Sequence, residues 1–268
     1  MKTEEGASRL RLERRGAVAR VWLARAERRN AFDDRLIGEL TSAFEELAGA
    51  SDVRVVVLAG EGSVFCAGAD IAWMRRAGGY SREENEEDAR RMAGMLRAID
   101  VCPRPVIALA HGAAIGGGVG LVAAADIAIA AEGTVFSLAE VKLGILPSVI
   151  SPYVLRAIGP RAARELFLTG ERFDAAEARR IGLVHAVVPA SDLEAAAKGK
   201  IDALLTSAPE AVGVAKKLIE QVAGMNPEEA RDLTVRTIAE RRASTEAREG
   251  LSAFLEKRPA SWVKPPEE

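Results

Sequence analysis

Apolar and polar residues alternate in two short segments near the amino terminus, at 10–14 and 18–23. Alternation with a period of two on either side of Gly16 predicts a β-hairpin. Farther on, Asp33 precedes apolar residues at helical spacing. This spacing predicts a helix that carries one apolar stripe and ends near Gly49.

Strand and helix patterns continue to alternate through the next hundred residues. The β-branched run 53–58 predicts a buried strand, and residues 83–100 have the pattern of a helix. Two further apolar runs, 106–110 and 127–130, predict strands. A chain that alternates in this way is expected to form an α/β fold.

The pattern changes after the short apolar run 183–188. From residue 191 onward nearly all residues favour helix, with interruptions expected at Pro209, Asn226-Pro227 and Gly250. We therefore expect a core over residues 1–190 and a helical carboxy-terminal region over residues 191–268. The apolar residues of that region could cover the same subunit or a neighbouring one, and the sequence favours neither alternative.

Composition narrows the classes of function. The 268 residues include 37 Lys and Arg against 39 Asp and Glu, a net charge of −2, which does not suit a dedicated nucleic-acid binder. No signal-like segment or apolar stretch of about 20 residues occurs, so a soluble, cytoplasmic protein without membrane association is expected. Cys66, Cys102, His111 and His185 lack the spacing of metal ligands and are expected to be structural.

Two segments rich in small residues follow predicted strands. In the first, residues 65–71, the chain must bend and expose backbone N–H groups, and Asp70 is placed to cap a following helix. The second, residues 111–120, leads into a helix start but lacks the Gly-Lys-Ser/Thr ending of a phosphate loop. Either segment alone fits an ordinary turn, but together they can supply two N–H donors to one carbonyl oxygen, which is an oxyanion hole.

The two segments are part of a longer series of motifs. FCAGADI at 65–71, HGAAIGGGVGL at 111–121 and FSLAEVKLGILP at 136–147 resemble, in order, the signature of the crotonase (enoyl-CoA hydratase/isomerase) family. The resemblance covers nearly the whole chain. It implies a spiral of ββα units with a helical carboxy-terminal region, and assembly as trimers or paired trimers.

The resemblance also implies a site for an acyl-CoA. The N–H groups of Ala67 and Gly117 are expected to form the oxyanion hole for the thioester carbonyl. Arg25 and Arg28 are weaker candidates for contacts with the CoA phosphates. The segment expected to line the adenine and pantetheine end consists of Ala67, Gly68, Ala69, Asp70 and Ile71. CoA is part of the substrate, and neither a metal nor a separate cofactor is expected.

Only one acidic residue remains where many family hydratases have two. Glu140 matches the later position, while the earlier position is Gly120, two residues after the glycine triplet. Glu140 is therefore expected to move the protons. We expect the glycine to open space near the β carbon of the substrate.

Three functions remain open at this stage. The stretch 144–175 most resembles bacterial methylglutaconyl-CoA hydratase-like members, which favours a hydratase for a branched 2-enoyl-CoA. A single glutamate also suits an enoyl-CoA Δ3,Δ2-isomerase, because a 1,3 proton shift needs one base. A weakly catalytic acyl-CoA- or RNA-binding relative is the third possibility.

Overall fold

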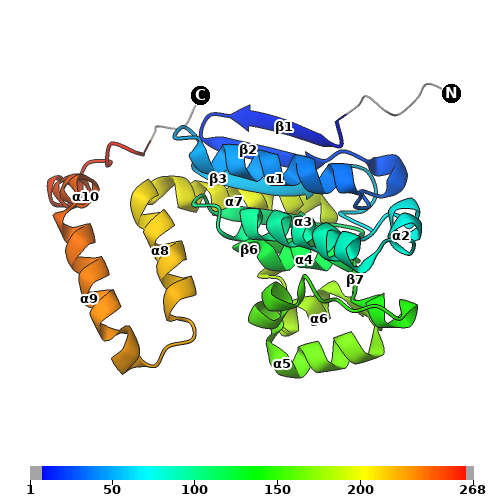
Figure 1. Ribbon diagram of the computed structural model, residues 1–268. Coiled ribbons are helices and arrows are strands. Elements are labelled where there is room, and N and C mark those ends of the chain that lie inside the picture. The colour runs from blue at the N-terminus through cyan, green and yellow to red at the C-terminus, as the bar shows by residue number, and fades with distance from the viewer. Residues whose placement is uncertain (1–7, 264–268) are drawn as a thin grey trace.

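The computed structural model describes residues 8–263, which fold into two β-sheets surrounded by helices (Figure 1). The larger sheet has six strands in the order β1-β2-β3-β4-β6-β9, and the smaller has three in the order β5-β7-β8. The strands of the larger sheet are β1 (Leu10–Arg15), β2 (Val18–Leu23), β3 (Val55–Gly60), β4 (Val106–Ala110), β6 (Ile127–Ala131) and β9 (Ala186–Val188). The strands of the smaller sheet are β5 (Ala113–Ile115), β7 (Val135–Ser137) and β8 (Arg172–Asp174).

The large sheet confirms the predicted hairpin and the predicted α/β class. Strands β1 and β2 pair antiparallel, with Arg15 opposite Val18, and every later pair in this sheet is parallel. Strand β3 begins two residues later than predicted, because Val53 still belongs to the preceding turn, where its N–H donates to the Ala50 carbonyl.

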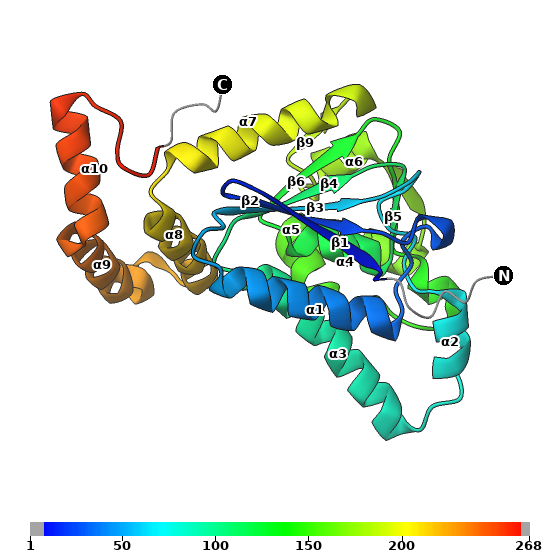
Figure 2. The same ribbon diagram turned by 90° about the horizontal axis from the view of Figure 1, so that it is seen from above.

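Helices cover the sheet on both faces, as Figure 2 shows. The helices up to residue 206 are α1 (Asp34–Gly49), α2 (Ile71–Ala77), α3 (Arg82–Asp100), α4 (Gly117–Ala124), α5 (Ser151–Thr169), α6 (Ala175–Arg180) and α7 (Leu193–Thr206). On β3, Val56 and Leu58 pack with α1 and α3, whereas Val55 and Val57 pack with α7. Burial on both faces explains why this strand is apolar throughout.

The smaller sheet was not predicted from the sequence. Each of its strands has only three residues, too few for an alternating pattern to show, and β5 lies inside the second glycine-rich segment. Its pairing brings β7 beside β5, so that Phe136 lies opposite Ala114. The chain leaves β7 into the short 3₁₀ helix η2 (Ala139–Leu143), which carries Glu140.

The carboxy-terminal helices form an arm that extends from the core (Figure 1). The arm consists of α8 (Pro209–Val222), α9 (Pro227–Ala243) and α10 (Thr245–Glu256). Helix α7 is different, since its Ala197 and Ile201 are buried against the large sheet. The predicted division at residue 190 therefore places one helix of the core in the carboxy-terminal region. None of the helices within residues 8–263 has the length and apolar character needed to cross a membrane.

The predicted interruptions of this region are confirmed at Pro209 and at Asn226-Pro227, but the one near Gly250 is wrong. The break lies at Ser244, whose hydroxyl accepts from the Ala247 N–H at 3.0 Å, and α10 continues through Gly250. A Cβ atom on Gly250 would lie 3.0 Å from the Trp262 ring. This glycine therefore makes room for a packed aromatic ring and does not end the helix.

Candidate active site

The two glycine-rich segments lie side by side, as their sequence suggested. The Cys66 N–H donates to the Ala113 carbonyl at 3.1 Å, and the Ile115 N–H donates to the Cys66 carbonyl at 3.0 Å. A Cβ atom on Gly118 would lie only 2.7 Å from that same Cys66 oxygen. Glycine at this position therefore permits the close approach of the two segments.

The Ala67 N–H is not available as the oxyanion donor that the sequence analysis assigned to it. It donates to the Arg29 carbonyl at 2.9 Å. Two residues later the chain is held by Phe32, whose N–H donates to the Gly68 carbonyl and whose carbonyl accepts from the Asp70 N–H, both at 2.7 Å.

Because the Gly68 carbonyl and the Asp70 N–H both face Phe32, the Ala69 N–H between them points away from residues 29–32. In a regular strand, N–H groups two residues apart point the same way, so Ala67 and Ala69 would both face residues 29–32. Gly68 interrupts this alternation with a φ of +88°. Within residues 8–263 the Ala69 N–H has no hydrogen-bond acceptor. The free donor on this segment is therefore Ala69.

Gly117 supplies the second free N–H. It is the first residue of α4, and the first N–H groups of a helix have no partner within it. No acceptor for this N–H occurs in the part of the chain that the structure describes. A Cβ atom here would lie 2.8 Å from the Phe32 ring and 3.0 Å from the Met92 methyl group, so a larger residue would require the Phe32 ring to shift.

Glu140 lies against the start of the same helix. The Gly116 N–H donates to the Ser137 carbonyl at 2.8 Å, which fixes the end of β7 beside the glycine triplet. A Cβ atom on Gly116 would be 2.8 Å from Glu140 Oε1. The other carboxyl oxygen, Oε2, is buried without a hydrogen-bond partner in the described structure, and burial raises the pKa of Glu140.

Gly120 does not open the space that the sequence analysis expected. A Cβ atom at this position would lie 2.9 Å from the Ile150 Cβ and closer still to its Cγ2. Ile150, the residue before α5, is 2% exposed. Its side chain fills the place where many family hydratases carry a second carboxylate, so this part of the site is apolar and closed.

Arg25 does not have the position expected of a phosphate ligand. It is 8% exposed, and its Nη1 lies 2.9 Å from Asp70 Oδ2, 3.4 Å from Asp33 Oδ2 and 2.9 Å from the Ala31 carbonyl. Arg28 is exposed on the 3₁₀ helix η1 (Ala26–Arg28) and remains a candidate for phosphate contact.

Asp70 caps α2 as predicted. Its Oδ1 accepts from the Ala72 N–H at 2.7 Å and from the Trp73 N–H at 3.3 Å. Burial raises the pKa of Asp70, but these two bonds and the charge of Arg25 outweigh it, so the net pKa lies below its ordinary value. The next residue, Ile71, is 73% exposed, which leaves an apolar side chain at the surface beside the loop.

The histidines and Cys66 have structural partners. His111 Nε2 lies 3.0 Å from the Gly62 carbonyl, and His185 Nδ1 accepts from the Ala128 N–H at 3.0 Å. The Cys66 thiol donates to the Asn30 carbonyl, and complete burial raises its pKa to about 12. A thiol with so high a pKa is not a nucleophile at neutral pH.

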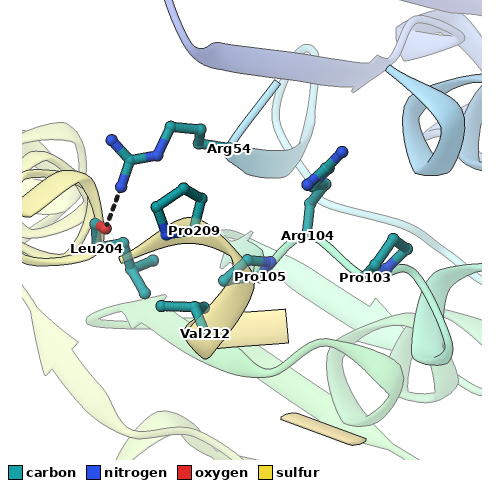
Figure 3. Close-up of a pocket in the computed structure, with 7 residues that line it drawn as sticks. All are labelled: Arg54, Pro103, Arg104, Pro105, Leu204, Pro209 and Val212. Atoms are coloured by element: carbon teal, nitrogen blue, oxygen red, sulfur yellow. Dashed lines mark hydrogen bonds between the residues drawn. The ribbon is translucent and has the colours of Figure 1, made fainter. Parts of the chain in front are cut away.

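A small pocket elsewhere in the molecule does not belong to this site (Figure 3). It lies beside the start of β4 and between α7 and α8, and none of the candidate-site residues described above lines it. Its Arg54 already donates to the carbonyls of Leu204, Ser207 and Trp262. This guanidinium ties the end of α7 to the sheet and is not a free anion site.

Two unpaired N–H groups and a glutamate with a buried carboxyl oxygen lie on the three segments that match the family signature, and comparison with known proteins identifies the family. The family model for enoyl-CoA hydratase/isomerase matches residues 13–265. The chain belongs to this family.

Solved structures resemble the chain over almost its full length. An enoyl-CoA hydratase from Shewanella pealeana is 41% identical with a TM-score of 0.93, and the match covers 97% of each chain. AtuE from Pseudomonas aeruginosa is 36% identical with a TM-score of 0.92, covering 96% of this chain and 100% of that one. By sequence, the chain is also similar to the enoyl-CoA hydratase ACTT6 of Alternaria alternata, with 33% identity over 91% of this chain and 80% of that protein.

Proposed function

We propose that this protein is an enoyl-CoA hydratase that adds water reversibly to a 2-enoyl-CoA. The observation that carries the proposal is the position of Glu140. One of its carboxyl oxygens lies against Gly116, the residue before Gly117 with its unpaired N–H group, and the other is buried without a partner in the described structure. Several similar proteins are named enoyl-CoA hydratases.

The proposed reaction needs only the substrate, water and these groups. The thioester oxygen accepts from the N–H groups of Ala69 and Gly117. Ionised Glu140 takes a proton from water as the oxygen adds to the β carbon, and the electron pair of the double bond moves onto the thioester oxygen. The two N–H groups stabilise the resulting enolate. Protonated Glu140 then returns its proton to the α carbon, so CoA enters only as part of the substrate.

A raised pKa suits this double role of Glu140. A group that first accepts and then donates the same proton works best when its pKa lies near the working pH. The pKa of an ordinary exposed glutamate lies well below neutrality. Burial raises the pKa of Glu140 from that ordinary value, in the direction of the working pH.

For the substrate, we propose a branched, methylglutaconyl-like acyl group. The support is the resemblance of the stretch 144–175 to that branch of the family. An open space at Gly120 no longer supports this choice, because Ile150 fills it.

Product analysis of the wild-type protein tests the reaction. We expect water addition to crotonyl-CoA and to 3-methylglutaconyl-CoA, with the higher kcat/KM for the branched compound. A higher kcat/KM for crotonyl-CoA would contradict the substrate assignment alone. No hydrated product from either compound would contradict the hydratase.

One observation favours an isomerase as the second candidate. Among the described residues that Cβ atoms on Gly116, Gly117, Gly118 and Gly120 would meet, only Glu140 is a carboxylate, and Ile150 keeps the place of a second one closed. A Δ3,Δ2 shift needs one base, which removes a proton from one carbon and returns it to another. A 3-enoyl-CoA converted rapidly to its 2-enoyl isomer, with no hydrated product, would make this the activity.

We further propose that the arm mediates assembly into a trimer or a pair of trimers. Its helices expose large apolar side chains within the described residues, among them Ile219 at 68%, Phe254 at 79% and Leu255 at 78%. Exposed apolar side chains gathered on one part of a protein commonly mark a contact surface.

A further inference from the structure

We propose that Arg25 is a positioning residue whose buried guanidinium sets the direction of the Ala69 N–H. The inference rests on the proposed function, since it takes Ala69 as an oxyanion donor. Arg25 does not touch the substrate in this account. It acts through Asp70, the neighbour of Ala69, and through the chain segment that holds both residues.

The guanidinium joins the starts of two helices. Asp70 caps α2, and Asp33 caps α1 by accepting from the Leu36 N–H at 2.9 Å. Arg25 Nη1 lies 2.9 Å from the Asp70 carboxylate and 3.4 Å from that of Asp33. One side chain therefore fixes the position of both caps relative to each other.

The same guanidinium holds the backbone between the caps. Arg25 Nη1 donates to the Ala31 carbonyl at 2.9 Å, and the Arg25 N–H donates to the Asn30 side chain at 2.9 Å. The Asn30 amide group donates in turn to the carbonyls of Glu61 and Val64, just before the 65–71 segment. Asn30 itself is fully buried.

Segment 29–32 then acts as a template for the oxyanion loop. Its residues bond Ala67, Gly68 and Asp70 through the three backbone contacts described above. A shift of this segment would move Ala69 with it. An error of about 1 Å in a catalytic group can cost roughly 100-fold in rate.

The position of Arg25 argues against direct phosphate binding. Its Nε is buried without a hydrogen-bond partner, and its charge is matched by two carboxylates that are themselves buried. The planar guanidinium can contact several acceptors in a fixed geometry, which the single ammonium group of lysine cannot reproduce. We therefore expect Arg25→Lys to restore only part of the function.

A substrate without the nucleotide separates positioning from phosphate binding. We would measure kcat and KM for the same enoyl group carried by CoA and by pantetheine, which lacks the ADP phosphates. Arg25→Met should lower kcat by roughly 10- to 100-fold on both substrates, and Arg25→Lys should recover part of it. The control is Arg14→Met, an exposed residue that pairs with Glu46 and Asp52, and it should leave kcat unchanged.

Two outcomes would overturn the proposal: an unchanged kcat in Arg25→Met, or a loss confined to KM for the CoA ester. If Arg25→Met does not fold, Asp70→Asn replaces it, because asparagine keeps the cap oxygen and removes the charge that Arg25 binds. It should show the same kcat loss on both substrates. Hydration and isomerisation by the wild-type protein are measured separately. A wild type that isomerises without hydrating would contradict the proposed hydratase. The effect of the Arg25 variants on kcat could still be compared between the two substrates.

Discussion

Ile150 occupies the space into which a side chain at position 120 would extend. A Cβ atom on Gly120 would lie 2.9 Å from the Ile150 Cβ, which is part of a fixed branch and not the end of a flexible chain. Gly116 immediately precedes α4 and Gly120 lies in its first turn; a Cβ atom on Gly116 would contact Glu140, and one on Gly120 would contact Ile150. The site thus has one acid and one apolar residue where two acids would otherwise stand.

This contact predicts that Gly120→Ala destabilises the protein. Alanine in place of glycine improves helix propensity by ~1 kcal/mol, but overpacking of a closed core costs about 1–3 kcal/mol. We expect a net loss in the free energy of unfolding, measured with denaturant. Gly94→Ala in α3 is the matched control, because nothing lies near its Cβ position, and it should raise stability. A smaller effect of Gly120→Ala in an Ile150→Ala background would confirm the contact, whereas additive effects would contradict it.

Replacing the backbone amide of Ala69 by an ester tests the assignment of the donor. Lactic acid at position 69 removes the N–H group and keeps the methyl side chain. We expect kcat to fall by ~10²–10³, the usual effect of losing one oxyanion donor. The same change at Ala67 breaks its bond to Arg29 and should mainly lower stability, by about 1 kcal/mol. A large kcat loss at Ala67 and none at Ala69 would return the role to Ala67.

The raised pKa of Glu140 predicts how stability depends on pH. The folded protein holds the Glu140 proton above the ordinary pKa of 4.5, where the unfolded chain has already lost it. Wild-type stability therefore decreases as pH rises through this interval, and Glu140→Gln lacks that decrease. The variant should be the more stable protein at neutral pH, with an advantage that shrinks as pH falls toward 4.5 and below. An advantage that grows on acidification would show that the pKa is lowered.

The arm predicts an assembly that depends on its apolar side chains. Phe254, 79% exposed on α10, should become less exposed in the oligomer. We expect sedimentation to show a trimer or a pair of trimers for the wild type and a smaller species for Phe254→Asp. A wild-type protein that sediments as a monomer at micromolar concentration would contradict the assembly.

Long patterns along the chain predicted most of the fold. Helix α1, which begins after Asp33, and strands β3, β4 and β6 were predicted from apolar patterns over four or more residues, and the structure contains all of them. The three-residue strands of the small sheet carry too little pattern to be predicted. Gly250 led to the prediction of a helix end, but α10 continues through it. The glycine is explained by packing, since a Cβ atom there would lie 3.0 Å from the Trp262 ring.

The site was predicted only as far as motifs reach. The motifs identified Glu140 and the glycine triplet, but they do not show which N–H of segment 65–71 is free. The Ala67 N–H is bonded to Arg29, and the positive φ of Gly68 turns the Ala69 N–H away from residues 29–32. Ile150 fills the Gly120 space from a distant part of the sequence, and no local signal connects the two. Arg25 looked like a phosphate ligand because its two carboxylate partners become its neighbours only on folding.

The central claim is that Glu140 alone moves the protons, and Glu140→Gln tests it most directly. Glutamine keeps the shape of the side chain and cannot accept the proton from water. We would measure kcat for hydration together with the Kd of the hydrated product in both proteins. We expect kcat to fall by ~10²–10⁴ while product binding is retained. Full hydratase activity in Glu140→Gln would contradict it.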